Sequence, residues 1–366
     1  MSEDARSRHE QLAAAFDRET DPLAKYETTF DRTAIDPFAL FVDEVLAAKD
    51  ITPRTRDDYD RVIRQWRTHM DTIGRHPACP APRHIRGFIE HERDERENHP
   101  DTIKEKLRKL REIYSYWQAV PSCPHPSEFD PFDIVRQRVS LDAPEQKPLP
   151  QIPLTELREF IANIDRLRNL AIVLMQLKLG LRASEVCNLV IGELDIQRDE
   201  LARHYSTLGD HWMLDGRPNA VYIPHDRYGN KSGRPRVLPL DEELQTALIR
   251  YLLVRLDVDS PWVFLSQRGN QLQKDDVATL WRDLFHPTYA ETEHHRGISS
   301  HYGRHRFTTY WRVKQDLARP LVKYLRGDRP GSVSITERDG IDQYIHTYYE
   351  DIERVVRTNS EQFDLK

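Results

Sequence analysis

Residues 180–186, with the sequence GLRASEV, follow directly on an apolar-rich stretch at residues 167–181. That stretch is shorter than the ~20 apolar residues that a membrane span needs, and polar residues interrupt it, so it predicts a buried helix. A glycine turn at its end would hold Arg182 firmly, and a planar guanidinium suits bidentate binding of a phosphate. Taken alone, the segment is equally compatible with an arginine that caps a helix or forms a salt bridge.

A second basic segment, residues 301–309, has the sequence HYGRHRFTT. On a helix His301 and Arg304 lie three residues apart and share a face. An imidazole and a second guanidinium can therefore meet one anion. The alternative for this segment is a solvated basic helix.

Strand-like runs at residues 220–224 and 236–240 predict a β-hairpin, with residues 226–233 at its tip. Lys231 lies in this tip, within GNKSGRPRVLPL at residues 229–240. A loop lysine is usually a surface charge, but an ammonium group that becomes enclosed can act as a general acid.

Three tyrosines, Tyr344, Tyr348 and Tyr349, lie on a helix predicted over residues 341–355, in the segment IDQYIHTYY. A helical tyrosine is ordinarily a packing residue. Its phenol ionises near pH ~10, so it attacks a phosphate only if positive groups stabilise the phenolate.

In this order, the four segments resemble the tyrosine recombinase (phage integrase) family of archaeal and bacterial type. GLRxxE is similar to the first arginine box of that family, HxxRHxFxT to its second, NKSGxxRVxPL to its hairpin lysine and YIH to its nucleophile box. The resemblance covers roughly residues 38–355. It implies a mainly α fold with a small antiparallel β-sheet: a helical SAM-like core-binding domain followed by a mixed α/β catalytic domain.

The resemblance also implies an activity, the site-specific cleavage and rejoining of DNA without a metal ion, ATP or another cofactor. Arg182 and Arg304 would clamp the scissile phosphate and stabilise the transition state. Glu185 would orient Arg182.

Tyr344 would attack the phosphate, which gives a 3′-phosphotyrosyl bond and a free 5′-hydroxyl. Lys231 would protonate the leaving 5′ oxygen, and His301 would assist proton transfer at the tyrosine. The implied partners are a double-stranded recombination site and further copies of the chain, from dimer to tetramer.

Asp328 departs from the family pattern, which usually has histidine or tryptophan at its position. An ionised Asp328 would repel a phosphate. Either Asp328 is turned away or protonated, or Arg326 or Arg329 takes over as donor. The spacing of sixteen residues from Asp328 to Tyr344 is also longer than usual, which leaves the two later tyrosines as backup nucleophiles.

Apolar periodicity and proline density divide the chain into an acidic extension (1–36), the helical domain (37–119), a proline-rich linker (120–153), the catalytic domain (154–356) and a tail (357–366). Lys104, Arg108 and Arg111 lie on the helix entered at Pro100, which is the candidate for groove contact. The two domains are expected to close around duplex DNA as a clamp. The tail is either a segment that docks on a neighbouring copy or a frayed end.

The net charge of −6 disfavours nucleic acid as a partner only weakly, because residues 227–236 and 301–314 each hold four basic residues and no acid. Three cysteines at wide spacing favour a reducing cytoplasm. With His76 and His125, Cys79 and Cys123 have no clean zinc-ligand spacing, so no metal site is expected.

Two other activities remain open. A type IB topoisomerase-like enzyme relaxes DNA by the same chemistry, and a catalytically inactive DNA-binding remnant is suggested by Asp328.

Overall fold

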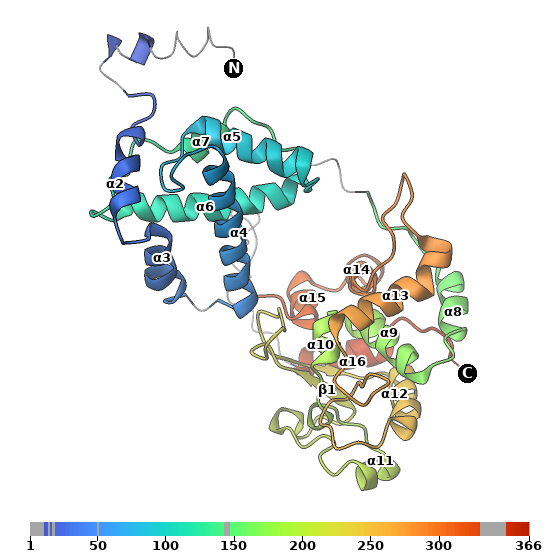
Figure 1. Cartoon of the computed structure of the whole chain (residues 1–366). Helices are drawn as coiled ribbons and strands as arrows, with labels where there is room; N and C mark the ends of the chain where they lie inside the picture. The colour runs from blue at the N-terminus through green and yellow to red at the C-terminus, as the bar shows by residue number, and fades with distance from the viewer. Residues whose placement is uncertain are drawn as a thin grey trace. The chain divides into compact units, whose positions relative to one another are not determined.

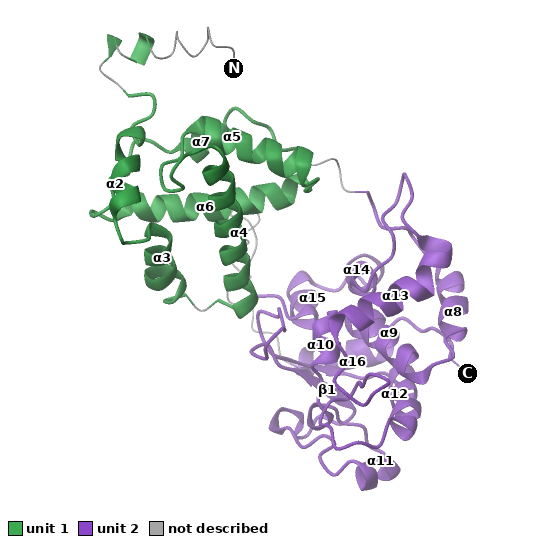
Figure 2. Ribbon diagram, in the orientation of Figure 1, with its two compact units in different colours: residues 1–146 green, residues 147–366 purple. Residues whose placement is uncertain are grey.

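The computed structural model describes residues 11–13, 15–16, 19–49, 51–142, 147–329 and 349–365. The chain separates into two compact units, residues 1–146 and 147–366 (Figure 1, Figure 2). Within the described ranges, none of the helices is both long and apolar enough to span a lipid bilayer.

All regular secondary structure in the described part of unit 1 is helical, and its two longest helices begin at Pro53 and at Pro100, the second as predicted. Thr52 caps the first of them, its Oγ1 accepting a hydrogen bond from the backbone N of Thr55 at 3.2 Å. Proline fits the first turn because no backbone N–H is needed there. The elements are η1 (Ala24–Tyr26), α2 (Glu27–Arg32), α3 (Pro37–Phe41), η2 (Val42–Leu46), α4 (Pro53–Thr72), α5 (Pro82–Glu90), η3 (His91–Glu95), α6 (Pro100–Ala119) and α7 (Pro131–Arg136).

The predicted acidic extension, residues 1–36, contributes to the core of unit 1. Leu23 is fully buried in it. Arg75, also buried, forms ion pairs with Asp21 at 2.8 Å and with Glu27. The charge excess of this segment is therefore partly neutralised within unit 1, which sequence periodicity does not reveal.

The predicted linker, residues 120–153, is also partly folded into unit 1. Helix α7 buries Phe132 and Val135 in the same core. Pro131 occupies its first turn, and Asp130 Oδ1 caps it by accepting from Asp133 N at 2.9 Å. Proline density thus marked a short capped helix here, and not only extended chain.

Unit 2 combines helices with a small sheet, as the sequence predicts. Strands β1 (Ala220–Ile223) and β2 (Arg236–Pro239) pair antiparallel, with Val221 opposite Leu238. The helical elements are α8 (Leu154–Ala162), α9 (Leu167–Leu179), α10 (Ala183–Cys187), η4 (Ile191–Glu193), α11 (Asp199–His204), η5 (Trp212–Leu214), α12 (Glu242–Val254), α13 (Lys274–Tyr289), α14 (His301–Thr309), η6 (Tyr310–Lys314), α15 (Arg319–Arg326) and α16 (Tyr349–Asn359).

Helix α9 runs through the middle of unit 2, packed against α12, α13 and α14 (Figure 1). Every residue from Leu170 to Leu179 is buried, as expected of a helix that is apolar on all sides. Gly303 of α14 lies against the backbone of Gln176, where a Cβ atom would come within 3.0 Å of the Gln176 carbonyl carbon. This close approach places the next residue of α14, Arg304, beside the end of α9.

The C-terminal tail packs on unit 2 itself. Phe363 is buried, and its backbone N and that of Leu365 each donate to Glu243 at 3.0 Å. Lys178 lies beneath them and pairs with Asp241 at 2.5 Å and with Glu243 at 2.6 Å. In this structure the tail is therefore part of the core of its own unit rather than a frayed end.

The turn that ends α9 yields the first prediction. Gly180 has a φ of +63°, and a Cβ there would lie 2.5 Å from the Phe307 ring. Gly180→Ala should lower the free energy of unfolding by about 2–5 kcal/mol, which sums left-handed strain and overpacking. Gly216→Ala is the matched control, because Gly216 has a φ of +72° and a Cβ added to it would meet no described atom within 4 Å. The free energy of unfolding of Gly216→Ala should fall by only about 1–2 kcal/mol. Urea titrations of both variants measure the two losses. Equal losses would contradict the steric role of Phe307.

Candidate active site

Arg182 and Arg304 converge on one anionic oxygen. Arg182 is the N-cap of α10, and Arg304 lies on α14. Arg182 Nη2 is 3.4 Å from Asp328 Oδ1, and Arg304 Nη2 is 2.9 Å from the same atom. The first and second arginine boxes therefore form one anion-binding cluster, named here the arginine cluster, which consists of Arg182, Arg304 and Arg326.

The Arg304 guanidinium is fixed before any ligand arrives. Its Nη1 donates to the backbone oxygen of Gly180 at 2.8 Å, and its Nη2 donates to that of Arg326 at 2.9 Å. Burial and the neighbouring charge of Arg182 lower the pKa of Arg304 to about 9, so it stays protonated at neutral pH. A preorganised, buried cation is the arrangement that best stabilises charge developing in a transition state.

Glu185 connects both sides of the site. Its Oε2 accepts from the backbone N of Arg182 at 2.8 Å. Arg236 reaches the two carboxylate oxygens with Nη1 and Nη2, each at 3.1 Å, and Ser232 Oγ also hydrogen-bonds Oε1. Burial opposes the ionisation of Glu185, but the charge and hydrogen bonds of Arg236 outweigh it and lower the pKa of Glu185 to about 2.

The predicted hairpin lysine lies in a segment anchored to this site. Lys231 is exposed between β1 and β2, next to Ser232. Two residues on, Gly233 N donates to the backbone oxygen of Gly327 at 2.7 Å. The hairpin tip is thus fixed at its base, while the lysine side chain itself faces solvent.

His301, the first residue of α14, is close to the same positive groups. Partial burial lowers its pKa, and the charges of Arg182, Arg304 and Lys231 lower it further. These interactions favour the neutral imidazole, the form that can accept a proton. Arg182 and Arg304 thus contact the same oxygen, and His301 interacts electrostatically with both of them and with Lys231.

Asp328 is not turned away, which corrects one of the alternatives drawn from the sequence. It follows Gly327, whose φ of +68° ends α15. Besides its contacts with Arg182 and Arg304, its Oδ2 lies 2.7 Å from Arg326 Nε. The carboxylate therefore occupies the centre of the arginine cluster.

Tyr344 and Tyr348 lie outside the described residues, but Tyr349 is described and is a packing residue. Its hydroxyl donates to Glu353 Oε1 and accepts from Arg357 Nη2, both at 3.1 Å. Burial raises the pKa of Tyr349 to about 12. None of these partners belongs to the arginine cluster, so Tyr349 is a poor nucleophile.

The three candidate DNA-binding residues of α6 are all paired with acids of unit 1. Lys104 is 3.5 Å from Asp101, Arg108 is 2.8 Å from Glu105, and Arg111 is 2.8 Å from Asp130. Exposed pairs of this kind contribute only about 0–1 kcal/mol, so a phosphate can replace the carboxylate. Their contact with DNA stays a prediction.

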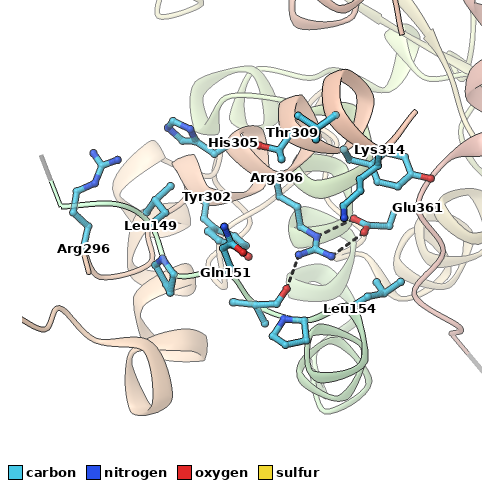
Figure 3. Close-up of a pocket in the computed structure, with 15 residues that line it drawn as sticks. Leu149, Gln151, Leu154, Arg296, Tyr302, His305, Arg306, Thr309, Lys314 and Glu361 are labelled. Atoms are coloured by element: carbon cyan, nitrogen blue, oxygen red, sulfur yellow. Dashed lines mark hydrogen bonds and ion pairs between the residues drawn. The ribbon is translucent and has the colours of Figure 1, made fainter. Parts of the chain in front are cut away.

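A cavity of about 830 Å³ lies beside α14 (Figure 3). It is lined by residues 149–154, by His305 and Thr309 of α14, and by Glu361. At its wall Arg306 forms two contacts of 2.8 Å with Glu361 (Figure 3). No member of the arginine cluster lines it, so it is not the candidate active site.

The histidines and cysteines considered for zinc take other roles in unit 1. His125 Nε2 is 2.7 Å from the Ala78 oxygen, and its ring stacks on Trp117 at 5.0 Å. His76 stacks on Phe30 at 5.0 Å. Among the described residues, no group of three or more His, Cys, Asp or Glu side chains is placed to hold a metal ion.

Sequence reasoning gave no role to Arg236 or Ser232, which complete the Glu185 network. Arg236 is 1% exposed, and its Nε also donates to Leu325 O at 2.9 Å. The only signal was its place beside the apolar run of β2, where an arginine needs a buried partner. Nothing local names that partner, because Glu185 lies far away in the sequence.

Comparisons with known proteins agree with this geometry. Residues 151–315 match the model of the phage integrase family. The tyrosine recombinase XerA of Pyrococcus furiosus is 30% identical over 173 residues, which cover 44% of this chain and 50% of that protein. The XerA of Pyrococcus horikoshii is 29% identical over 126 residues, covering 34% of this chain and 35% of the relative. The alignments thus span half or less of these curated relatives.

Solved structures share the fold at low sequence identity. The Tn1549 transposon integrase in complex with a circular intermediate DNA has a TM-score of 0.60 at 17% identity, covering 87% of this chain and 97% of that one. A lambda integrase bound to DNA has a TM-score of 0.57 at 11% identity, covering 83% and 96%.

The predicted fold class, mainly α with a small antiparallel sheet, is therefore confirmed as that of tyrosine recombinase integrases. The match to the phage integrase family covers residues 151–315, which contain three of the four sequence segments that indicated this family.

The buried Glu185–Arg236 pair yields the second prediction. Glu185→Gln should lower the free energy of unfolding by about 3–5 kcal/mol, because it leaves the Arg236 charge buried without a counter-ion. Glu350→Gln is the control; Glu350 is 64% exposed and 3.1 Å from Arg217, so its loss should be about 0–1 kcal/mol.

Glu185→Gln should also change how the free energy of unfolding depends on pH. Since the pKa of folded Glu185 is about 2 and that of an unfolded glutamate is ~4.3, its contribution is fully present above pH ~4.3. It is lost as the pH falls towards 2. Urea titrations from pH 6 downward should show a shallower acid decline for Glu185→Gln. An unchanged acid decline would refute the ionised pair.

Proposed function

We propose that the chain is a site-specific DNA recombinase or integrase that cleaves and rejoins strands through a 3′-phosphotyrosyl intermediate. The observation that carries the proposal is the convergence of Arg182 and Arg304 on one anionic oxygen. Two guanidinium groups from separate helices, one of them buried, are arranged to hold the non-bridging oxygens of a phosphodiester.

The arginines act mainly on the transition state. Attack on phosphorus places more negative charge on the equatorial oxygens, and donors that are already fixed stabilise it without reorganisation. Arg304 meets this condition through its two backbone acceptors, Gly180 and Arg326. Glu185 keeps Arg182 at the start of α10 by accepting from its backbone N.

Tyr344 is the proposed nucleophile. Its oxygen forms a bond to phosphorus, while the bond to the 5′ oxygen breaks and that oxygen takes a proton from Lys231. His301, whose pKa is lowered by burial and by its cationic neighbours, accepts the tyrosine proton. The phosphodiester energy is kept in the phosphotyrosyl bond, so a 5′-hydroxyl can reverse the reaction without ATP.

The proposed partners are a double-stranded recombination site and other copies of the chain. Exchange between two sites requires cleavage of both strands at each, which fits a dimer on one site and a tetramer on two. Two observations support DNA as the partner: the anion-binding cluster, and the resemblance to integrases whose structures are described as bound to DNA. The proposed location is the cytoplasm.

Trapping the covalent intermediate tests this function. On a suicide substrate nicked beside the cleavage point, the native chain should form a protein–DNA adduct and Tyr344→Phe none, because only the attacking oxygen is lost. Arg182→Ala and Arg304→Ala should also lose the adduct, with DNA binding largely kept. Denaturing gels and peptide mapping give the readout.

Tyr349→Phe and Tyr348→Phe serve as matched controls and should keep the adduct. An adduct mapped to Tyr348 or Tyr349 would overturn the assignment of Tyr344. If the native chain binds DNA and forms no adduct at all, the inactive DNA-binding remnant is the correct interpretation. Relaxation of supercoiled DNA without strand exchange would instead identify a topoisomerase-like enzyme.

Salt dependence tests DNA backbone recognition separately. The dissociation constant for duplex DNA should rise steeply between low and moderate salt, because each neutralised phosphate releases condensed counter-ions. Lys231→Ala should reduce the slope of the log–log plot by about one. Fluorescence anisotropy over a chloride series gives the slope, and a flat plot would contradict phosphate contact.

A further inference from the structure

The Asp328 carboxylate is bound by three guanidinium groups. Oδ1 lies 2.9 Å from Arg304 Nη2 and 3.4 Å from Arg182 Nη2, and Oδ2 lies 2.7 Å from Arg326 Nε. Its side chain is 24% exposed, so one side of the group remains open to solvent. Asp328 thus contacts all three cations, and Glu185 contacts one of them, Arg182, at 3.6 Å.

A carboxylate and a phosphodiester present the same features to such a cluster. Each carries one negative charge over two terminal oxygens, and each accepts forked hydrogen bonds from arginine. Arg182 Nη1 is buried and forms no hydrogen bond with any described residue, and it lies 3.6 Å from Glu185 Oε1 in an ion pair. The cluster therefore has a donor that Asp328 does not satisfy.

We propose that the Asp328 carboxylate is a stand-in for the phosphate, which the phosphate displaces, and that Arg326 then becomes the third guanidinium on the bound anion. Two anions cannot share the position, because their repulsion in a partly buried site is large. The inference rests on the proposed function only in taking the natural anion to be a DNA phosphodiester.

Displacement requires a side-chain rotation and no refolding. The Asp328 backbone is held by its own N–H, which donates to the Lys323 oxygen at 2.9 Å, and by the turn at Gly327. Arg326 is held independently, with Nη1 donating to Thr308 Oγ1 at 3.0 Å and its backbone oxygen accepting from Arg304. The arginines thus keep their places when the carboxylate leaves.

The stand-in has a consequence for selectivity. A free oxyanion must displace Asp328 with the binding free energy of the cluster alone. A phosphate within a duplex brings the contacts of the rest of the DNA, which offset the cost of displacement. Asp328 thereby reserves the arginine cluster for phosphates that arrive as part of a larger ligand.

Sulfate binding to the full chain, measured by isothermal titration calorimetry at pH 7, tests the proposal without DNA. Asp328→Asn removes the charge and keeps the shape, and it should bind sulfate at least about tenfold more tightly than the native chain. Asp328→Glu keeps the charge and should not gain affinity. Asp316→Asn is the matched control; Asp316 is 98% exposed, so sulfate affinity should stay unchanged.

Arg326 is tested in the Asp328→Asn background. Adding Arg326→Ala should remove most of the gain in sulfate affinity, and a thermal melt in sulfate-free buffer verifies that each variant is folded. Native or weaker sulfate affinity in folded Asp328→Asn overturns the stand-in. An undiminished gain in the double variant overturns the role of Arg326.

These outcomes are separate from those of the proposed function. Sulfate binding requires neither DNA nor Tyr344, so tightened binding in a chain that forms no adduct would refute the recombinase and support the stand-in. An adduct in the native chain together with unchanged sulfate affinity in Asp328→Asn would support the recombinase and refute the stand-in.

Discussion

The buried contact between Glu185 and Arg236 fixes the relative positions of the segments of unit 2 that form the candidate active site. Glu185 lies on α10 and Arg236 on β2, and Arg236 continues to Leu325 at the end of α15. One ion pair, with the further hydrogen bond of Arg236, therefore joins the start of α10 at Arg182, the hairpin and the end of α15 just before Asp328. Because both partners are fully buried, neither can be lost without leaving an uncompensated charge, which makes the pair a constraint on geometry more than a source of stability.

Much of this architecture is written in local sequence. The apolar stretch of α9, the helix α6 entered at Pro100 and the Lys231 hairpin are each encoded within a short segment, and the ordered boxes indicated the phage integrase family, whose model matches residues 151–315. The roles of Arg236 and Ser232 were missed because they depend on a partner distant in the chain. Asp328 shows the same limit: its sequence position predicted repulsion of an anion, whereas three arginines bind it. The roles of Tyr344 and of α6 in DNA contact stay predictions.

The arginines considered for phosphate binding are paired with acidic side chains in this structure. Arg108 and Arg111 of unit 1 and Arg304 of unit 2 all contact acids of their own unit. Exposed pairs on α6 exchange partners at small cost, while buried pairs do not. Arginines paired with acids at the surface can therefore exchange the acid for a phosphate, whereas buried arginine–acid pairs keep the geometry of the fold.

The contacts of the C-terminal tail determine which of its positions depend on residue type. Glu243 accepts hydrogen bonds from the main-chain N–H groups of Phe363 and Leu365, which every residue except proline provides. Phe363 is also recognised by its side chain, through burial and the Lys178 ammonium 5.4 Å from its ring, while the Gln362 and Asp364 side chains contact Asp241 and Arg158. Homologues should therefore retain an aromatic anchor and the acidic acceptor here, whereas the residue at position 365 needs only a main-chain N–H for its bond to Glu243.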